Sequence, residues 1–427
     1  MRWLFPLYAL LLPFQFALSP VEGVDLALIR IAALGIGAYW LAFSLARRKL
    51  FLPSGATVLF FLAFLVFAMS SALWAENSTF ALRKGVFLLS FAPLFFVAAS
   101  WFKESKACIL DTTKAFVVGA FILGLGAVGL FFLQFFVGVG NIVAVLTGSI
   151  LPFFLGTTFG QAVADYPSLL VNISGTTLLR ASGIFPDPHM FSYYMGMAFP
   201  LALFLAYSET KQRRFWLAVS ALLFLADLFS FSRGGYVGLL LGVGVLILSF
   251  WHGFSFWRTR QWGFFALGTL VLVVALFGTP FGARLTSIFS QGDGSNVERL
   301  RLWKEAVVHI TERPLLGVGV GNYPLLVKPG APYREPIYAH NLYLDLALEV
   351  GIVGLLFFCA TLLSVFWRLG SIYAVTRDFF PLALIASLTV FVGHSFFETP
   401  LFSVHILSAL LLLLAIGVSY RHDQTPS

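Results

Sequence analysis

Runs of apolar residues that recur along the whole chain are the feature that most restricts how this sequence folds. A helix of about 20 apolar residues spans the hydrocarbon core of a bilayer. Twelve apolar runs have close to this length, at residues 3–19, 26–45, 58–74, 86–102, 116–136, 190–208, 215–231, 236–251, 263–276, 342–366, 379–392 and 402–419. The sequence therefore predicts an all-α integral membrane protein with about twelve transmembrane helices.

The composition excludes a water-soluble fold. Hydrophobic residues make up 59% of the chain and charged residues only 11%, whereas a soluble domain carries roughly a quarter charged residues. No polar stretch is long enough to form a separate soluble domain. We therefore expect residues 1–427 to form a single polytopic membrane domain, with 3–19 retained as its first helix.

Basic residues predict the orientation of these spans, because Lys and Arg in short loops stay in the cytoplasm. They cluster after every second span, which predicts that both termini are cytoplasmic. The cytoplasmic set is Arg47, Arg48, Lys49, Lys103, Lys106, Lys211, Arg213, Arg214, Arg258, Arg260, Arg368, Arg377 and Arg421.

Two long connections are predicted on the outer face, at 138–189 and 277–341. The first is largely apolar and is expected to lie partly in the membrane interface. The second contains a helical stretch at 296–311, followed by a glycine-rich segment at 317–321. That segment predicts a flexible turn, because it lacks the strand and helix that frame a nucleotide-binding loop. Long ordered loops often carry binding and catalysis.

The predicted outer face also carries many basic residues, although Lys and Arg are normally enriched in cytoplasmic loops. Surface charge is the simpler interpretation, and we prefer it for Lys328 and Arg334. It is weaker for Arg233, at the edge of an apolar hairpin, where an unpaired charge is costly. The outer set is Arg83, Lys84, Arg180, Arg233, Arg284, Arg299, Arg301, Lys304, Arg313, Lys328 and Arg334.

One histidine of the second loop suits acid/base chemistry. His340 precedes Asn341 at a predicted helix start on the outer face, where a near-neutral pKa fits general acid/base work. A lone histidine is more often structural. His189 lies beside two prolines and is interpreted as part of a turn, and His394 as a polar contact of an outer helix end. No clustered ligand spacing predicts a metal site or another cofactor.

Five segments, in order, resemble the O-antigen ligase family. They are 180–187, 231–236 with its Ser-Arg-Gly turn, 299–303 with Arg-x-x-x-Trp, 314–319 with Pro-Leu-x-Gly-x-Gly, and 340–351 with His-Asn followed by Gly. Each motif alone has low specificity, but their order and their shared placement on the outer face argue against a chance resemblance. His189 departs from the pattern, because relatives commonly have Asn there, and no role is transferred to it.

The resemblance implies a fold similar to C-type glycosyltransferases and an inverting, metal-independent reaction at the periplasmic face. The donor would be a polysaccharide on undecaprenyl diphosphate, and the acceptor would be the lipid A core. His340 would be the base, with Arg233 and Arg299 also catalytic. The expected residues that bind the donor diphosphate are Arg180, Arg233, Arg299, Arg301 and Asn341.

Other functions stay open at this point. An O-antigen polymerase uses the same donor, and a glycosyltransferase that modifies protein belongs to the same superfamily. A transporter or flippase would also be a helical bundle with intramembrane charge, but it needs a path through both leaflets. A membrane scaffold gives no reason for Arg233, Arg299 and His340 to occupy family positions.

Overall fold

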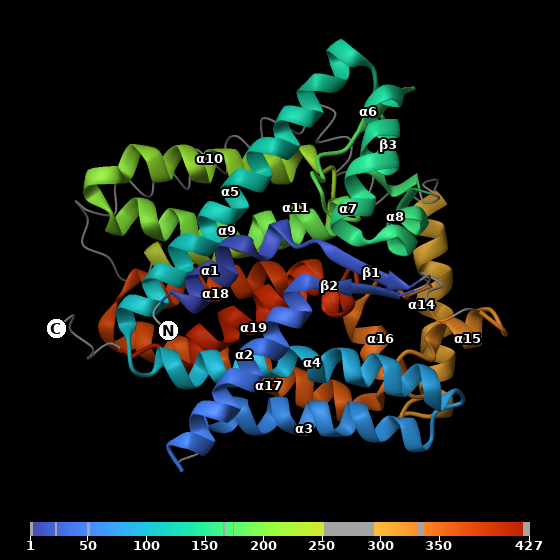
Figure 1. The fold of residues 1–427 in the computed structure, drawn as a ribbon, viewed down its shortest axis with the longest axis horizontal. Coiled ribbons are helices and arrows are strands. Elements are labelled where there is room, and N and C mark those ends of the chain that lie inside the picture. Colours follow the sequence, from blue (N-terminus) through green and yellow to red (C-terminus); the bar gives the residue numbers. More distant parts are fainter. Residues whose placement is uncertain are drawn as a thin grey trace.

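The computed structural model describes residues 3–21, 24–48, 52–164, 167–173, 175–251, 294–331, 333 and 337–421. The predicted span 263–276 lies outside these residues, as do Lys49, Arg258, Arg260, Arg284 and Arg334. The described residues form a bundle of helices with two small β-hairpins (Figure 1).

The first half of the chain supplies α1 to α8 and the first hairpin. The elements are α1 (Leu4–Leu11), η1 (Leu12–Phe14), β1 (Ala17–Val21), β2 (Val24–Ala27), α2 (Leu28–Ala46), α3 (Ala56–Ser70), η2 (Ser71–Leu73), α4 (Ser78–Phe102), α5 (Lys106–Val137), α6 (Val139–Val145), η3 (Leu146–Ile150), α7 (Leu151–Leu155) and α8 (Thr157–Ala164).

The second half supplies the second hairpin and the remaining helices. They are η4 (Pro167–Leu169), β3 (Leu170–Ile173), β4 (Thr176–Leu179), α9 (Pro188–Ser208), η5 (Thr210–Gln212), α10 (Arg213–Phe229), α11 (Arg233–Trp251), α14 (Gly294–Glu312), α15 (Tyr323–Val327), α16 (Leu342–Glu349), α17 (Gly351–Thr376), α18 (Phe379–His394), η8 (Pro400–Phe402) and α19 (Val404–Ser419). Both hairpins are antiparallel, with Ala17 opposite Ala27 in one and Leu170 opposite Leu179 in the other.

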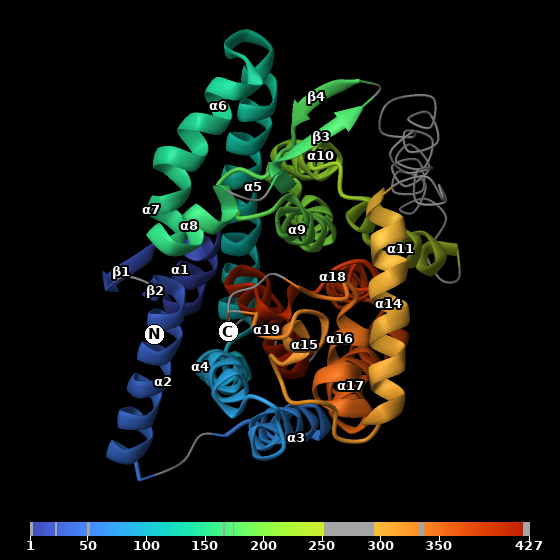
Figure 2. The same ribbon diagram turned by 90° about the vertical axis from the view of Figure 1, so that its right-hand side faces the viewer.

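The helices confirm the predicted class, an all-α polytopic membrane protein. Within the described residues, six helices are long and apolar enough to cross a bilayer: Leu28–Ala46, Ala56–Leu73, Ser78–Phe102, Lys106–Val137, Pro188–Ser208 and Gly351–Thr376. Shorter apolar helices join them at Leu4–Phe14, Val139–Leu155, Arg233–Ser249, Phe379–His394 and Val404–Ser419. Helix α9 is buried over nearly its whole length and packs against α5, α10, α11 and α18 (Figure 2).

Two predicted spans differ from the observed helices. The run 342–366 is broken at Gly351, where φ is +66° and α16 gives way to α17. The mostly apolar run does not reveal this break, because the break depends on packing against the chain near Leu315. The run 3–19 is helical only to Phe14, and from Ala17 the chain enters the first hairpin.

The two long connections contain ordered elements. The connection 138–189 holds α6, α7, α8 and the second hairpin, and the helix expected at 296–311 is confirmed as α14. The segment 317–321 is a turn as expected, but backbone hydrogen bonds from Val318 to Leu348 (2.9 Å) and from Gly319 to Glu349 (2.8 Å) fix it to α16. In Figure 1, α14, α15 and the first hairpin gather at the right-hand end of the bundle, which we call the site end.

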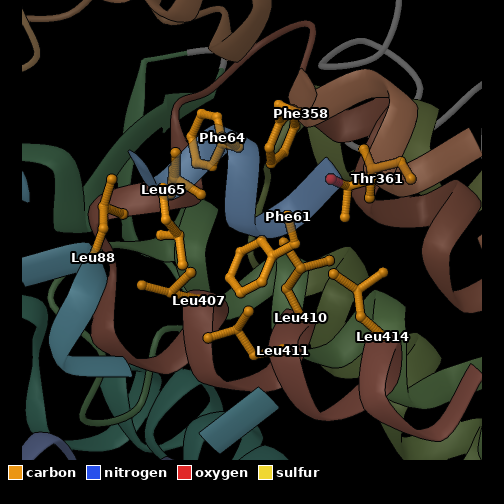
Figure 3. A pocket seen from close by; sticks show the side chains of 12 residues that line it. Phe61, Phe64, Leu65, Leu88, Phe358, Thr361, Leu407, Leu410, Leu411 and Leu414 are labelled. Atoms are coloured by element: carbon orange, nitrogen blue, oxygen red, sulfur yellow. The ribbon is translucent and has the colours of Figure 1, made fainter. Parts of the chain in front are cut away.

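An apolar gap in the core is not the place of the chemistry. It lies between α3, α4, α17 and α19 (Figure 3). Its one polar side chain, Thr361, donates a hydrogen bond to the Phe357 carbonyl of its own helix. It is lined by Phe61, Phe64, Leu65, Leu88, Phe358, Thr361, Leu362, Leu401, Leu407, Leu410, Leu411 and Leu414.

Candidate active site

A buried carboxylate, Glu398, lies at the centre of a charged cluster at the site end. It follows α18 and is 5% exposed. His340 Nδ1 lies 2.9 Å from Glu398 Oε2, and Arg299 Nη2 lies 2.8 Å from Oε1. His189 Nε2 lies 3.8 Å from Oε1. A buried carboxylate is stable only when it is paired and hydrogen-bonded, and these contacts supply the partners of Glu398. The two predicted residues His340 and Arg299 therefore contact the same carboxylate, which the sequence did not single out.

The cluster shifts the pKa values of its members. Burial alone would raise the pKa of Glu398, but the charges of His340 and His189, with the hydrogen bond from His340, hold it well below its usual value. The Glu398 charge raises the pKa of His340, against an opposing effect of burial. The pair is therefore most stable as a carboxylate facing an imidazolium.

The pairing also orients the imidazole of His340. A proton on Nδ1 is donated to Glu398, so in the neutral ring Nε2 carries the lone pair. The side chain is 38% exposed, whereas that of Glu398 is 7% exposed. His340 has φ of +50°, in the left-handed region that residues with a side chain seldom adopt. This conformation and the ion pair together hold the ring at the edge of the cluster.

Helix α16 fixes the segment that carries His340. Asn341 is its N-cap, and its side chain accepts hydrogen bonds from the backbone of Tyr343 and Leu344. One turn later, Asp345 accepts the Ala339 backbone N–H at 2.8 Å and the Thr399 hydroxyl. Asp345 thus ties the residue before His340 to the residue after Glu398.

Two further hydrogen bonds hold the same segment from other elements. The indole of Trp303, on α14, donates to the Ala339 carbonyl at 2.8 Å. The Leu342 N–H donates to the Ser395 carbonyl at 2.9 Å. The tryptophan of the Arg-x-x-x-Trp motif therefore positions the histidine segment, while Arg299 of the same motif reaches the Glu398 carboxylate.

The second arginine of α14 does not join the cluster. Arg301 forms ion pairs with Glu298 (2.5 Å) and Glu305 (2.6 Å) of its own helix. Its side chain is 52% exposed, whereas that of Arg299 is 14% exposed. The two arginines therefore have different surroundings. Arg299 pairs with the buried Glu398, whereas Arg301 lies on an exposed surface of the helix.

The Ser-Arg-Gly-Gly turn begins α11 beside the cluster. Ser232 Oγ lies 2.9 Å from His189 Nδ1 and 3.2 Å from His394 Nε2. The next residue, Arg233, is 3% exposed. A Cβ on Gly234 would lie 2.6 Å from the His394 ring. The glycine therefore permits the close packing that brings the arginine turn against α18.

Arg180 lies deeper, where it holds two backbone segments. It is 5% exposed, and it donates to the Ser230 carbonyl at 2.7 Å and to the Ser168 carbonyl at 3.1 Å. Its place therefore links the second hairpin region to the turn before Arg233.

Sequence reasoning missed Glu398, Ser232 and the place of His189, whereas the polar contact expected for His394 is found with Ser232. His189 is in the first turn of α9, whose N-cap Asp187 accepts the His189 N–H at 2.5 Å. Burial, with the charge of Glu398, raises the pKa of Asp187 to about 6. The available signal for Glu398 was a single acid directly after an apolar helix at the outer face.

The arrangement suits the handling of an anionic leaving group beside a base. It offers Arg299 near the His340 imidazole, whose basic nitrogen is set by the Glu398 carboxylate, which is the pattern of an oriented general base. Residues 195–359 match a family model described as O-antigen ligase. No curated protein matches the chain significantly.

Proposed function

Because residues 195–359 match a family model described as O-antigen ligase, we propose that this chain is an O-antigen ligase. On this proposal it transfers a polysaccharide from undecaprenyl diphosphate to the lipid A core at the periplasmic face of a bacterial inner membrane. Both termini are cytoplasmic, and the site end faces the periplasm. The observation that most supports the proposal is that Glu398 pairs with both His340 and Arg299.

The proposed reaction is a direct displacement. His340 Nε2 accepts the proton of the acceptor hydroxyl while the hydroxyl oxygen forms a bond to the anomeric carbon of the donor sugar. The bond from that carbon to the diphosphate oxygen breaks, and the diphosphate leaves with the electron pair. Attack opposite the leaving group inverts the anomeric centre. No metal or other cofactor takes part in this scheme.

Arg299 and Arg233 bind the donor diphosphate in this scheme. Negative charge grows on the leaving oxygens, so fixed guanidinium groups stabilise the transition state more than the ground state. The contact of Arg299 Nη2 with Glu398 leaves its other N–H groups for phosphate, because a guanidinium has five donors. Arg180, Arg301 and Asn341 act at the edges of the donor site, Asn341 through the cap that precedes α16.

Glu398 acts as a positioning residue. It touches no substrate atom in the scheme but selects the tautomer of His340 and strengthens it as a base, since its charge raises the histidine pKa. His189 and Ser232 complete the surroundings of the carboxylate.

The choice of acceptor tests the reaction class. Purified protein is incubated with a lipid-linked polysaccharide and either lipid A core or a second lipid-linked repeat. Transfer to lipid A core supports the ligase. Extension of the second repeat alone would make the chain a polymerase, and accumulation of lipid-linked donor across a vesicle membrane without transfer would favour a flippase.

Substitution of the arginines tests their roles. Arg299→Ala and Arg233→Ala should each lower kcat/KM by about a hundredfold or more, because a paired contact to a developing charge is lost. Lys at either position should restore little, since it lacks the planar fork. Lys304→Ala, exposed on the same helix as Arg299, is the matched control and should leave transfer unchanged.

Arg301→Ala separates the two arginines of α14. Its pairs with Glu298 and Glu305 are exposed and contribute little to stability. We therefore expect a smaller loss than for Arg299→Ala. Transfer at the wild-type rate by well-inserted Arg299→Ala protein would contradict the proposed donor site.

A further inference from the structure

Arg83 and Lys84 form a second basic group at the site end, on the first turns of α4 (Ser78–Phe102). Arg83 Cζ lies 3.9 Å from the centre of the Tyr333 ring. Lys84 Nζ lies 3.6 Å from the centre of the Phe402 ring and 3.4 Å from Tyr338 Oη. The reaction scheme uses none of these residues.

Neither cation has an acidic partner among the residues that the structure describes, where no carboxylate lies within 4.0 Å of Arg83 or Lys84. Glu349 is the acid that interacts electrostatically with Lys84. It is 3% exposed, and burial raises its pKa to about 7 despite the charge of Lys84. Near neutral pH the acid is therefore partly protonated and offsets Lys84 incompletely.

A third cation extends the group toward α2. Arg30 donates from Nε to Ser90 Oγ at 2.7 Å, and its Cζ lies 5.5 Å from the Phe87 ring centre. The Phe87 ring lies 6.3 Å from that of Phe402, which also contacts Lys84. Three cations from two helices thus share a lining of aromatic rings. We call Arg30, Arg83, Lys84, Tyr333, Tyr338 and Phe402 the α4 patch.

The α4 patch adjoins the candidate active site through the chain itself. Tyr338 precedes His340 by two residues, and Phe402 follows Glu398 by four. Lys84 contacts this segment from α4, whereas Trp303 holds Ala339 from α14. Figure 2 shows α15 and α16 between α4 and α14. A ligand on the α4 patch would therefore lie against the segment that carries His340 on the side of α4, whereas Arg299 belongs to α14.

We propose that the α4 patch binds the acceptor, and that it recognises phosphate groups on the acceptor saccharide. Arginine and lysine pair with phosphate oxygens, and aromatic rings offer apolar faces to the C–H surfaces of sugar rings. This inference rests on the proposed transferase function. It assigns the donor diphosphate to the α14 side and the acceptor to the α4 side of His340.

The test measures acceptor and donor separately in lipid nanodiscs. The double variant Arg83→Gln/Lys84→Gln should raise the acceptor KM about ten- to hundredfold, from the loss of two charge-assisted contacts. The donor KM and kcat should stay near wild type. Arg313→Gln, an exposed arginine after α14, is the matched control and should change neither KM.

A second arm identifies the group that is recognised. Lipid A core is compared before and after chemical removal of the phosphates on its core sugars. The dephosphorylated acceptor should show a raised KM with wild-type protein and no further rise with the double variant. An equal effect of the substitutions on both acceptors would overturn phosphate recognition.

A third arm excludes the phosphates of the surrounding bilayer as the ligand. The KM is measured in nanodiscs of neutral phosphatidylcholine and in nanodiscs that contain phosphatidylglycerol. A variant defect seen only with phosphatidylglycerol, or a wild-type acceptor KM in the double variant, would overturn the inference. Wild-type protein without any transfer would instead refute the proposed function, and direct binding of the phosphorylated core oligosaccharide in the absence of donor would still decide on the patch.

Discussion

The pairing of His340 with Glu398 joins residues that the sequence separates by 58 positions. His340, Arg299 and Arg233 could be selected from sequence, because each lies in a short motif with a chemical meaning. Glu398 could not be assigned in this way, since its role comes from the packing of the α18 end against the segment before α16. Asp345, with its pKa raised to about 6 by burial, was equally hidden inside an apolar run.

This pair predicts a pH dependence. A base must be neutral, so single-turnover transfer at saturating donor should rise with pH through the pKa of His340. Glu398 raises that pKa above the ordinary value, and Glu398→Gln removes the charge. The midpoint should therefore move to lower pH in the variant, with a lower plateau because the tautomer is no longer selected.

The opposite slope would assign His340 a different role. If the imidazolium only binds phosphate, transfer should fall as pH rises, and Glu398→Gln should move that fall to lower pH. His340→Gln distinguishes the same alternatives at one pH. A base cannot be replaced by an amide, so we expect a loss on the order of a hundred- to ten-thousandfold.

At the scale of elements, the break between α16 and α17 decides where His340 lies. Hydropathy was sufficient to predict the long helices, and the caps at Asn77 and Ser105 agree with simple N-terminal rules. It was insufficient for the break, because the run 342–366 is predominantly apolar on both sides of Gly351, despite Asp345 and Glu349. The break needs a positive φ at Gly351 and a close approach to the Leu315 carbonyl, and only the packed structure contains that information.

Gly351→Ala should therefore disrupt the site end. An alanine Cβ would lie 2.1 Å from the Leu315 oxygen, and the left-handed conformation itself costs about 1–2 kcal/mol. We expect a Tm lower by several degrees in detergent and loss of transfer. Gly370→Ala, in α17 with no atom within 4 Å of its added Cβ, is the control and should keep or slightly raise the Tm.

At the scale of the whole molecule, alternation of apolar helices and basic loops predicted the class of fold and the order of most spans. It did not predict which helix would be central. Helix α9 is enclosed by α5, α10, α11 and α18 because small residues allow close contact, as where Gly196 faces Val390 and Gly124 faces Met195. Such contacts depend on pairs of helices and leave little trace in the hydropathy of either one.

The predicted orientation is open to chemical labelling. Cys108 and Cys359 are first replaced by Ala, and a single cysteine is placed at Lys211 or at Arg313. A maleimide that cannot cross membranes should label Arg313→Cys in spheroplasts at once, and Lys211→Cys only after lysis. Labelling in the reverse order would place the site end in the cytoplasm and exclude a periplasmic transferase.

The cluster around Glu398 also has a consequence for biosynthesis. Its members come from α9, the turn before α11, α14, the segment before α16 and the segment before α19. A ribosome delivers Glu398 to the membrane after all but the last of these helices. We therefore expect a nascent chain that stops before Glu398 to insert its earlier helices but to leave the lipid-linked donor intact. The enzyme would then become active only once translation has passed Glu398.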